Sequence, residues 1–157
     1  IETSSSIDAW ILSRLVETIR FVEANFVSGY NLHLVVKKLR EFFYQDFCDF
    51  YLECTKPTLK STSDEKRRER AIKWNILRVC NKCMLLMYHP FMPSITEELW
   101  QQVNFEREER QVGEVKSILS QKFPTTKHLA QFKVKKKSIR LFVFQKKIFC
   151  HSDTNHI

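Results

Sequence analysis

The fold is set first by residues 6–26, which read SIDAWILSRLVETIRFVEANF. Apolar side chains recur there every three or four residues, which is the period of one face of an α-helix. They are Ile7, Ile11, Leu15, Ile19, Val22 and Phe26. Ser5 or Ser6 can cap the start of this helix, and Ser28-Gly29 is expected to end it.

A second helix is expected between Asn31, which can cap it, and Pro57, which should stop it. Proline has no amide hydrogen and pushes the residue before it away from helical geometry. The apolar residues of this helix keep helical spacing, so we assign them to the core. They are Leu32, Val35, Val36, Leu39, Phe42, Phe43, Phe47, Phe50, Tyr51 and Cys54.

Capping-box patterns predict a third and a fourth helix. Thr62 and Glu65 have the required spacing at the start of the third, and Ser94 and Glu97 have it at the start of the fourth. The third helix opens with the basic run 66–70, becomes apolar, and ends at the His-Pro of the next break. Its apolar residues are Ile72, Trp74, Ile76, Leu77, Val79, Cys80, Cys83, Met84, Leu86 and Met87.

These amphipathic helices predict an all-α fold, an antiparallel bundle of about four helices over residues 1–103. Residues 104–157 change character and are assigned to a separate basic tail. Within it, 105–121 is expected to form a solvated helix, and 132–149 either one or two short strands or unpacked chain. The tail holds most of the net charge of +8, because 104–157 contain 12 basic and 5 acidic residues, against 14 and 13 in 1–103.

Composition excludes several classes of function. The chain has only 2 glycines, where average usage would give about 11. Because Rossmann and P-loop nucleotide sites need clustered glycines, both are excluded. There is no run of about 18 apolar residues and no recognisable signal peptide, so no membrane association is expected. An odd number of cysteines favours reduced thiols inside a cell, and a chain that starts at Ile1 is expected to be a piece of a longer protein.

Four strings, in this order, resemble the anticodon-binding helical bundle of class I aminoacyl-tRNA synthetases, of the valyl type. They read DAWILSRL at 8–15, DFCDFYLE at 46–53, KP at 56–57 and HPFMPSITEELW at 89–100. The second string followed by Lys-Pro favours the valyl type over its isoleucyl and leucyl relatives. The motif residues, for which the resemblance implies a structural role, are Asp8, Trp10, Arg14, Asp46, Cys48, Asp49, Tyr51, Glu53, Pro57, Pro90, Pro93, Glu97 and Trp100.

The resemblance implies a module that binds the anticodon region of tRNA Val, within an enzyme that joins valine to that tRNA in the cytoplasm or in mitochondria. The family's catalytic motifs, His-x-Gly-His and Lys-Met-Ser-Lys-Ser, are absent from this sequence. We therefore expect no catalytic residue and no activity from this chain alone. The expected partners of this chain are tRNA Val and the catalytic domain of the parent protein. ATP and Mg²⁺ would bind to that catalytic domain. The alternative is a structural or protein-interaction module without specific tRNA binding.

Candidate tRNA contacts are cations and off-stripe tyrosines. The cations, which could neutralise phosphates, are Lys37, Lys38, Lys56, Lys60, Arg67, Arg68, Arg70 and Lys73. A run of charge is more commonly a plain solvated face, and this second interpretation stays open. Tyr30 and Tyr44 lie off the apolar stripe and are candidates for stacking on bases. The alternative, that each is an ordinary half-buried tyrosine without a binding role, stays open. Arg14 is expected to pair with Asp46 or Asp49.

The Cys80-x-x-Cys83 pair, with His89 nearby, invites a zinc or redox interpretation. Structural zinc requires four ligands, and both cysteines fall in the apolar stripe of an expected helix. Buried cysteine commonly behaves as a small apolar residue. We therefore predict no metal site.

Overall fold

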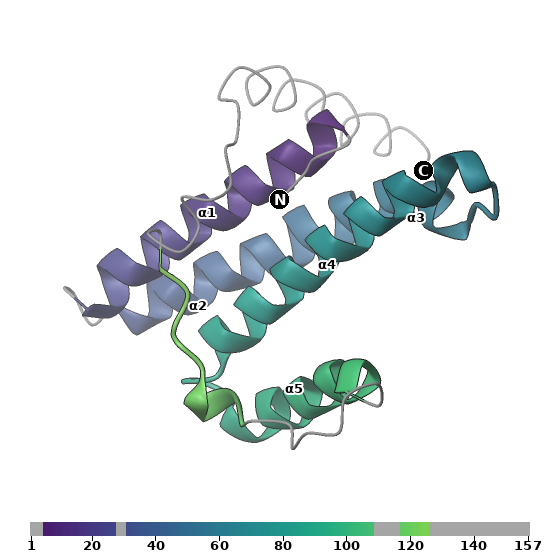
Figure 1. Ribbon diagram of the computed structural model, residues 1–157. Coiled ribbons are helices and arrows are strands. Elements are labelled where there is room, and N and C mark those ends of the chain that lie inside the picture. Colours follow the sequence, from purple (N-terminus) through teal and green to yellow (C-terminus); the bar gives the residue numbers. More distant parts are fainter. Residues whose placement is uncertain (1–4, 28–30, 109–116, 126–157) are drawn as a thin grey trace, which may run out of the picture.

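The architecture comes from a computed structural model, which describes residues 5–27, 31–108 and 117–125, with backbone alone for 27 and 104–108. The expected all-α, antiparallel helical bundle is confirmed (Figure 1). Its elements are α1 (Ser6–Val27), α2 (Leu32–Glu41), the π-helix η1 (Phe42–Leu52), α3 (Glu53–Lys60), the 3₁₀ turn η2 (Asp64–Lys66), α4 (Arg67–Tyr88), α5 (Pro93–Glu108) and the 3₁₀ turn η3 (Ile118–Ser120).

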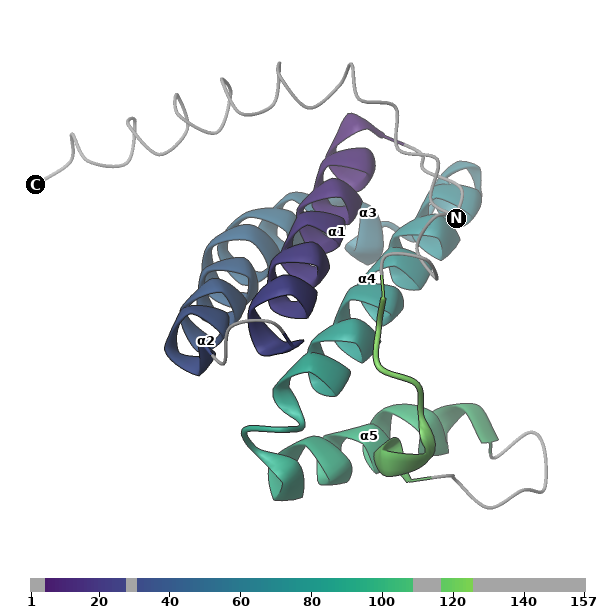
Figure 2. The ribbon, with the colours of Figure 1, turned by 90° about the vertical axis from the view of Figure 1, so that its left-hand side faces the viewer.

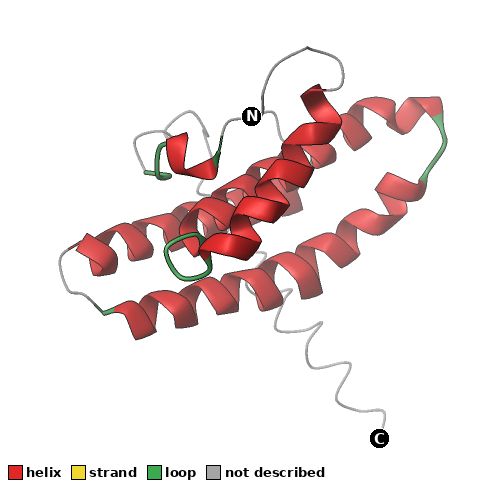
Figure 3. Ribbon diagram, turned by 90° about the horizontal axis from the view of Figure 1, so that it is seen from below, coloured by secondary structure: helices red, strands yellow, loops and turns green. Residues whose placement is uncertain are grey.

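Three long rods make the body of the bundle: α1, the continuous helix α2–η1–α3, and α4. They lie side by side and alternate in direction, while α5 turns away and crosses below the end of α4 (Figures 1 and 2). Seen from below, the described chain consists of helices and short connections (Figure 3). The core lies between the rods and is built from Trp10, Ile11, Leu12, Leu15, Ile19, Val22, Val35, Leu39, Phe42, Phe47, Tyr51, Ile72, Ile76, Leu77, Cys80, Met84 and Met87.

The start of α1 is capped by Ser5, one of the two serines expected there. The Ser5 Oγ accepts from the amide of Asp8 (3.4 Å), and the Asp8 carboxylate accepts from the amide of Ser5 (3.2 Å). This reciprocal arrangement is a capping box with Asp as the returning side chain. It orients the Asp8 carboxylate at the end of the bundle where α1 begins.

The middle rod differs from the expected α-helix because 11 of its residues, Phe42–Leu52, form a π-helix. Its buried side chains recur at intervals of four and five residues, as i→i+5 hydrogen bonding requires. They are Phe42, Asp46, Phe47, Tyr51 and, just beyond, Thr55. The assignment of the apolar residues of this rod to the core is wrong for Leu32, Val36 and Cys54, which are exposed, whereas Phe43 and Phe50 are half-buried and pack against the core.

Pro57 does not end the helix, contrary to the sequence prediction, because it lies inside α3, which continues to Lys60. Pro57 can donate no amide hydrogen bond to the preceding turn. In the same turn the hydroxyl of the buried Thr55 donates to the carbonyl of Leu52 (2.9 Å).

The two predicted capping boxes do not form. The chain enters α4 through the η2 turn, whose cap Ser63 makes no side-chain capping bond, and α4 itself begins at Arg67. The fourth helix begins at Pro93, so Ser94 already lies inside it. Proline suits a first helical position because its fixed φ is already helical and its missing amide is not needed there.

The described fold continues past the predicted boundary at 103. The α5 helix runs to Glu108, and residues 117–125 return to the bundle. Glu97 holds this return, since its carboxylate accepts from Ser117 Oγ (2.9 Å) and from the amide of Ile118 (3.0 Å). Phe123 then lies against Phe26 of α1, with ring centroids 6.4 Å apart. The strands or unpacked chain predicted for 132–149 lie outside the described residues.

The Glu97 contact predicts a pH-dependent release of residues 117–120. Hydrogen bonds from Gln101, Ser117 and Ile118 lower the pKa of Glu97 below its ordinary 4.5. A lowered carboxyl pKa stabilises the fold above the unfolded-state value, and this stabilisation is lost as pH falls through the folded-state value. We expect the hydrogen-exchange protection factor of the Ile118 amide to decrease when the pH is lowered below 4.5. A Glu97→Gln variant keeps an acceptor oxygen but has no carboxyl group to titrate, so its protection should not change across this pH range; the same fall in both proteins would contradict this role.

Candidate nucleic-acid interface

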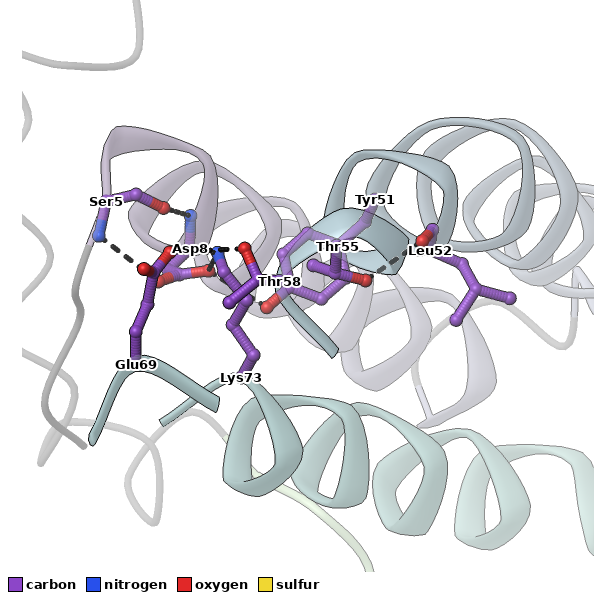
Figure 4. Close-up of polar contacts among 8 residues, drawn as sticks. All are labelled: Ser5, Asp8, Tyr51, Leu52, Thr55, Thr58, Glu69 and Lys73. Atoms are coloured by element: carbon purple, nitrogen blue, oxygen red, sulfur yellow. Dashed lines mark hydrogen bonds and ion pairs between the residues drawn. The ribbon is translucent and has the colours of Figure 1, made fainter. Parts of the chain in front are cut away.

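A buried polar cluster joins the three rods at one end of the bundle (Figure 4). Asp8 of α1 is fully buried, and its Oδ1 accepts from the Tyr51 hydroxyl (3.0 Å) and from Lys73 Nζ (3.3 Å). Burial, followed by the charge of Asp8, raises the pKa of Tyr51, so the phenol stays protonated and donates. Two of the family motif residues thus act together as a structural anchor.

Lys73, a candidate for phosphate contact, belongs to this cluster. Its side chain is 4% exposed, and Glu69 lies 3.7 Å from its ammonium on the other side. The run of charge at the start of α4 therefore splits: Arg67 and Arg68 face solvent, whereas Lys73 faces the core. We leave Lys73 out of the candidate surface.

Arg14 pairs with Asp46, one of the two carboxylates expected for it. The Arg14 Nε donates to Asp46 Oδ2 (2.9 Å), and Asp46 is buried in η1. Arg14 also bonds Glu17, which in turn pairs with Lys38 (3.2 Å). This network fixes α1 against the middle rod, as predicted, and it occupies the ammonium of Lys38.

The connection between α3 and α4 is shaped by side chains of the first turn of α4. Arg70 donates to the carbonyls of Ser61 and Ser63, and the Thr58 hydroxyl donates to Glu69 (3.4 Å). Arg70, another candidate for tRNA contact, is thus half-buried and engaged with the backbone. The bundle corner formed by these residues has a defined shape.

Exposed cations gather at this corner. We call the group the corner cations: Lys56, Lys60, Lys66, Arg67 and Arg68. All five are exposed, and Lys56 pairs with the equally exposed Glu53. They lie at the end of α3 and the start of α4, which pack together (Figure 1). Lys66, Arg67 and Arg68 lie at the start of α4, where cations oppose the helix dipole, so an external anion would stabilise them.

The remaining candidates lie on the middle rod, away from the corner. Lys37 is exposed, and it precedes Lys56 by enough helix to separate them by roughly 25–30 Å. Tyr44 is 53% exposed, with the Arg40 guanidinium 5.8 Å from its ring centroid. Tyr30 lies outside the described residues. The corner and the Tyr44 face are therefore separate surfaces.

Trp74 is an exposed side chain that the sequence analysis placed in the core. It is 56% exposed on the outer face of α4. Helical spacing contained the signal, since Ile72 and Ile76, two residues on either side, are buried and must face the other way. An exposed aromatic plane beside basic side chains is typical of surfaces that stack nucleobases.

The other motif residues differ in how far they are buried. Trp10 is buried and meets the edge of Phe50 at 4.9 Å between ring centroids, and Trp100 is buried with the Lys82 ammonium 5.2 Å from its ring centroid. Cys48 is half-buried, whereas Asp49, Glu53, Pro57, Pro90 and Pro93 are exposed.

The cysteine pair on α4 lies in apolar surroundings. Burial raises the pKa of the Cys80 thiol, and raises that of Cys83 to about 11. In the part of the chain that the structure describes, no three His, Cys, Asp or Glu side chains gather as metal ligands would. None of the described helices has the length and apolar content needed to cross a bilayer.

Comparison of the sequence with known proteins identifies the family to which this chain belongs. The sequence model of the anticodon-binding domain of tRNA ligases matches residues 8–148, which includes much of the segment assigned above to a tail. The valine–tRNA ligase of Carboxydothermus hydrogenoformans is 40% identical over 99 residues, or 63% of this chain and 11% of that protein. The valine–tRNA ligase of Thermotoga maritima is 37% identical over 103 residues, which are 66% of this chain and 11% of that protein.

A third relative is the probable mitochondrial valine–tRNA ligase of Dictyostelium discoideum, which is 34% identical over 113 residues, or 72% of this chain and 10% of that protein. The chain thus spans about a tenth of the length of these relatives. The family match covers most of the chain and the bundle has the expected helices. The resemblance is confirmed, and the chain belongs to the anticodon-binding domains of tRNA ligases.

Proposed function

We propose that this chain is the tRNA-binding module of a longer valine–tRNA ligase, and that it binds the anticodon region of tRNA Val. The observation that carries the proposal is the family match over 8–148 together with relatives named as valine–tRNA ligases. Aminoacylation, with its ATP and Mg²⁺, would belong to other domains of the parent chain. The corner cations supply the electrostatic contact that binding to a phosphate backbone needs.

Binding at the corner predicts a particular salt dependence. Removing one phosphate contact reduces the slope of log K against log salt concentration by about 1. We expect this reduction for Arg67→Ala, measured by titration with a tRNA Val transcript. Arg20→Ala, which removes an exposed cation from α1, is the matched control and should leave the slope unchanged. Equal slopes for both variants would exclude the corner as the binding surface.

Specificity is tested by a transcript with an altered anticodon. Preference for tRNA Val over that transcript supports anticodon recognition. Weak binding that is blind to the anticodon and falls steeply with salt would instead indicate non-specific charge attraction.

The second candidate function, a structural or protein-interaction module, is favoured by one face of α5. Ile95 and Leu99 of α5, and Met92 just before its first residue, follow helical spacing and are 52%, 41% and 46% exposed. An apolar helical stripe is typical of a surface that packs against another part of a protein. If the chain shows no preference for tRNA Val, this second function becomes the better explanation of the fold.

A further inference from the structure

The outer face of α4 carries an aromatic side chain between two cations. Arg67, Trp74 and Arg78 are all exposed. At about 100° per residue, these positions fall within about 40° of one another around the helix axis, and they span about 16 Å along it. The three side chains therefore form one line, the α4 stripe, which continues from the corner cations.

The electrostatics of this helix are one-sided. Arg67–Tyr88 contains six basic residues, and its single acidic residue is Glu69. Glu69 does not oppose the stripe, because its carboxylate engages Thr58 and lies 3.7 Å from Lys73 on the inner side. An anion approaching the stripe meets Arg67 and Arg78 without a carboxylate of α4 between them.

The exposure of Trp74 is the second observation. Trp10 and Trp100 are only 2% and 5% exposed, whereas Trp74 is 56% exposed. Its neighbours in the sequence, Lys73 and Asn75, give no apolar surface to cover it: one is buried in the polar cluster and the other is exposed. Cationic side chains on either side of a bare aromatic plane match the phosphates and bases of a single strand.

We propose that the α4 stripe is a stacking site for an unpaired nucleobase, with the base lying on the Trp74 indole and the flanking phosphates facing Arg67 and Arg78. This rests on the nucleic-acid binding proposed above and adds a site to it. Stacking is independent of base identity, because every base has a π-face. The stripe therefore contributes affinity for unpaired RNA, and base recognition is left to other contacts.

The test uses the full 157-residue chain, with a tRNA Val transcript and a short oligouridine as probes. Losing one stacked base weakens binding about 5- to 150-fold, and we expect this for Trp74→Ala at low and at high salt alike. Trp74→Phe keeps a stacking plane and should retain most of the affinity. Ile95→Ala, which removes a comparably exposed apolar side chain from α5, should bind as the parent does.

Fluorescence gives a readout that a structural role would not move. A base stacked on Trp74 quenches its emission, while Trp10 and Trp100 are shielded by burial. Quenching by oligouridine is expected in the parent chain and should be lost in Trp74→Phe. If the parent binds tRNA Val and Trp74→Ala binds it equally well, the stacking site is overturned and the proposed function stands. If tRNA Val is not preferred but oligouridine still quenches Trp74, the proposed function fails and the stacking site stands.

Discussion

Replacing Asp8 by alanine is expected to lower the free energy of unfolding by about 4 kcal/mol, because it leaves the Lys73 ammonium buried without its principal partner. Lys73 is 3% exposed, and its Nζ lies 3.3 Å from the Asp8 carboxylate. The same change removes the acceptor of the buried Tyr51 hydroxyl and half of the Ser5 capping box. Since domains of this size are commonly stable by only 5–15 kcal/mol, the variant should be close to unfolding at 25 °C. Urea denaturation measures the loss.

Two further variants separate charge from hydrogen bonding in this cluster. Asp8→Asn keeps an acceptor for Tyr51 but loses the charge, so it should lie between the parent and Asp8→Ala. Adding Lys73→Met to Asp8→Asn removes the unpaired charge and should recover stability. A loss of less than 1 kcal/mol for Asp8→Ala would show that the cluster does not support the fold. Because the pKa of Tyr51 is raised, the contribution of the cluster should also be lost as pH rises above about 10.

Replacing Trp10 by alanine is expected to cost about 3–5 kcal/mol, the usual range for removing a large aromatic side chain from a core. Trp10 is 2% exposed and contacts Phe50 edge to face at 4.9 Å, so the change leaves a cavity between α1 and η1. Trp10→Phe keeps part of that contact and should cost less.

The same residue type at another position supplies the control. Trp74→Ala removes an identical side chain from an exposed face and is expected to change stability by no more than about 0.5 kcal/mol. Denaturation of both variants in the same buffer makes the comparison. If the two tryptophans prove equally important for stability, the assignment of Trp10 to the core and of Trp74 to the surface is contradicted.

Much of the bundle could be predicted because its first helix follows a simple period. The stripe from Ile11 to Val22 is buried as expected, and the Arg14 pairing was foreseen from acidic residues in the second string. The π-helix could not be foreseen in this way, because a 3.6-residue template cannot represent i→i+5 bonding. The α-helical template therefore assigned the exposed Cys54 to the core and passed over Asp46 as a buried residue.

The errors on α4 have a different cause. The basic residues of α4 were all assigned to a candidate surface and its apolar residues all to the core, although a helix places neighbouring residues on different faces. Lys73 and Trp74 are adjacent in sequence, yet one is 3% and the other 56% exposed. Applying the helical period residue by residue predicts both placements. The capping box predicted at Ser94 and Glu97 failed for a further reason: Pro93, which suits a first helical position, begins α5, and a local pattern cannot tell that Glu97 bonds to Ile118, 21 residues later.

The Asp8 cluster also has a consequence for how the chain acquires its structure. Its two longest links join residues 43 and 65 positions apart, so the cluster cannot close until α4 has reached α1. A partly assembled form with α4 packed and α1 absent would leave the Lys73 ammonium without Asp8, its nearer and fully buried counterion, which is unfavourable. We therefore expect few stable partial structures and a single cooperative folding transition, in which α1 is fixed in place only once α4 has packed against it.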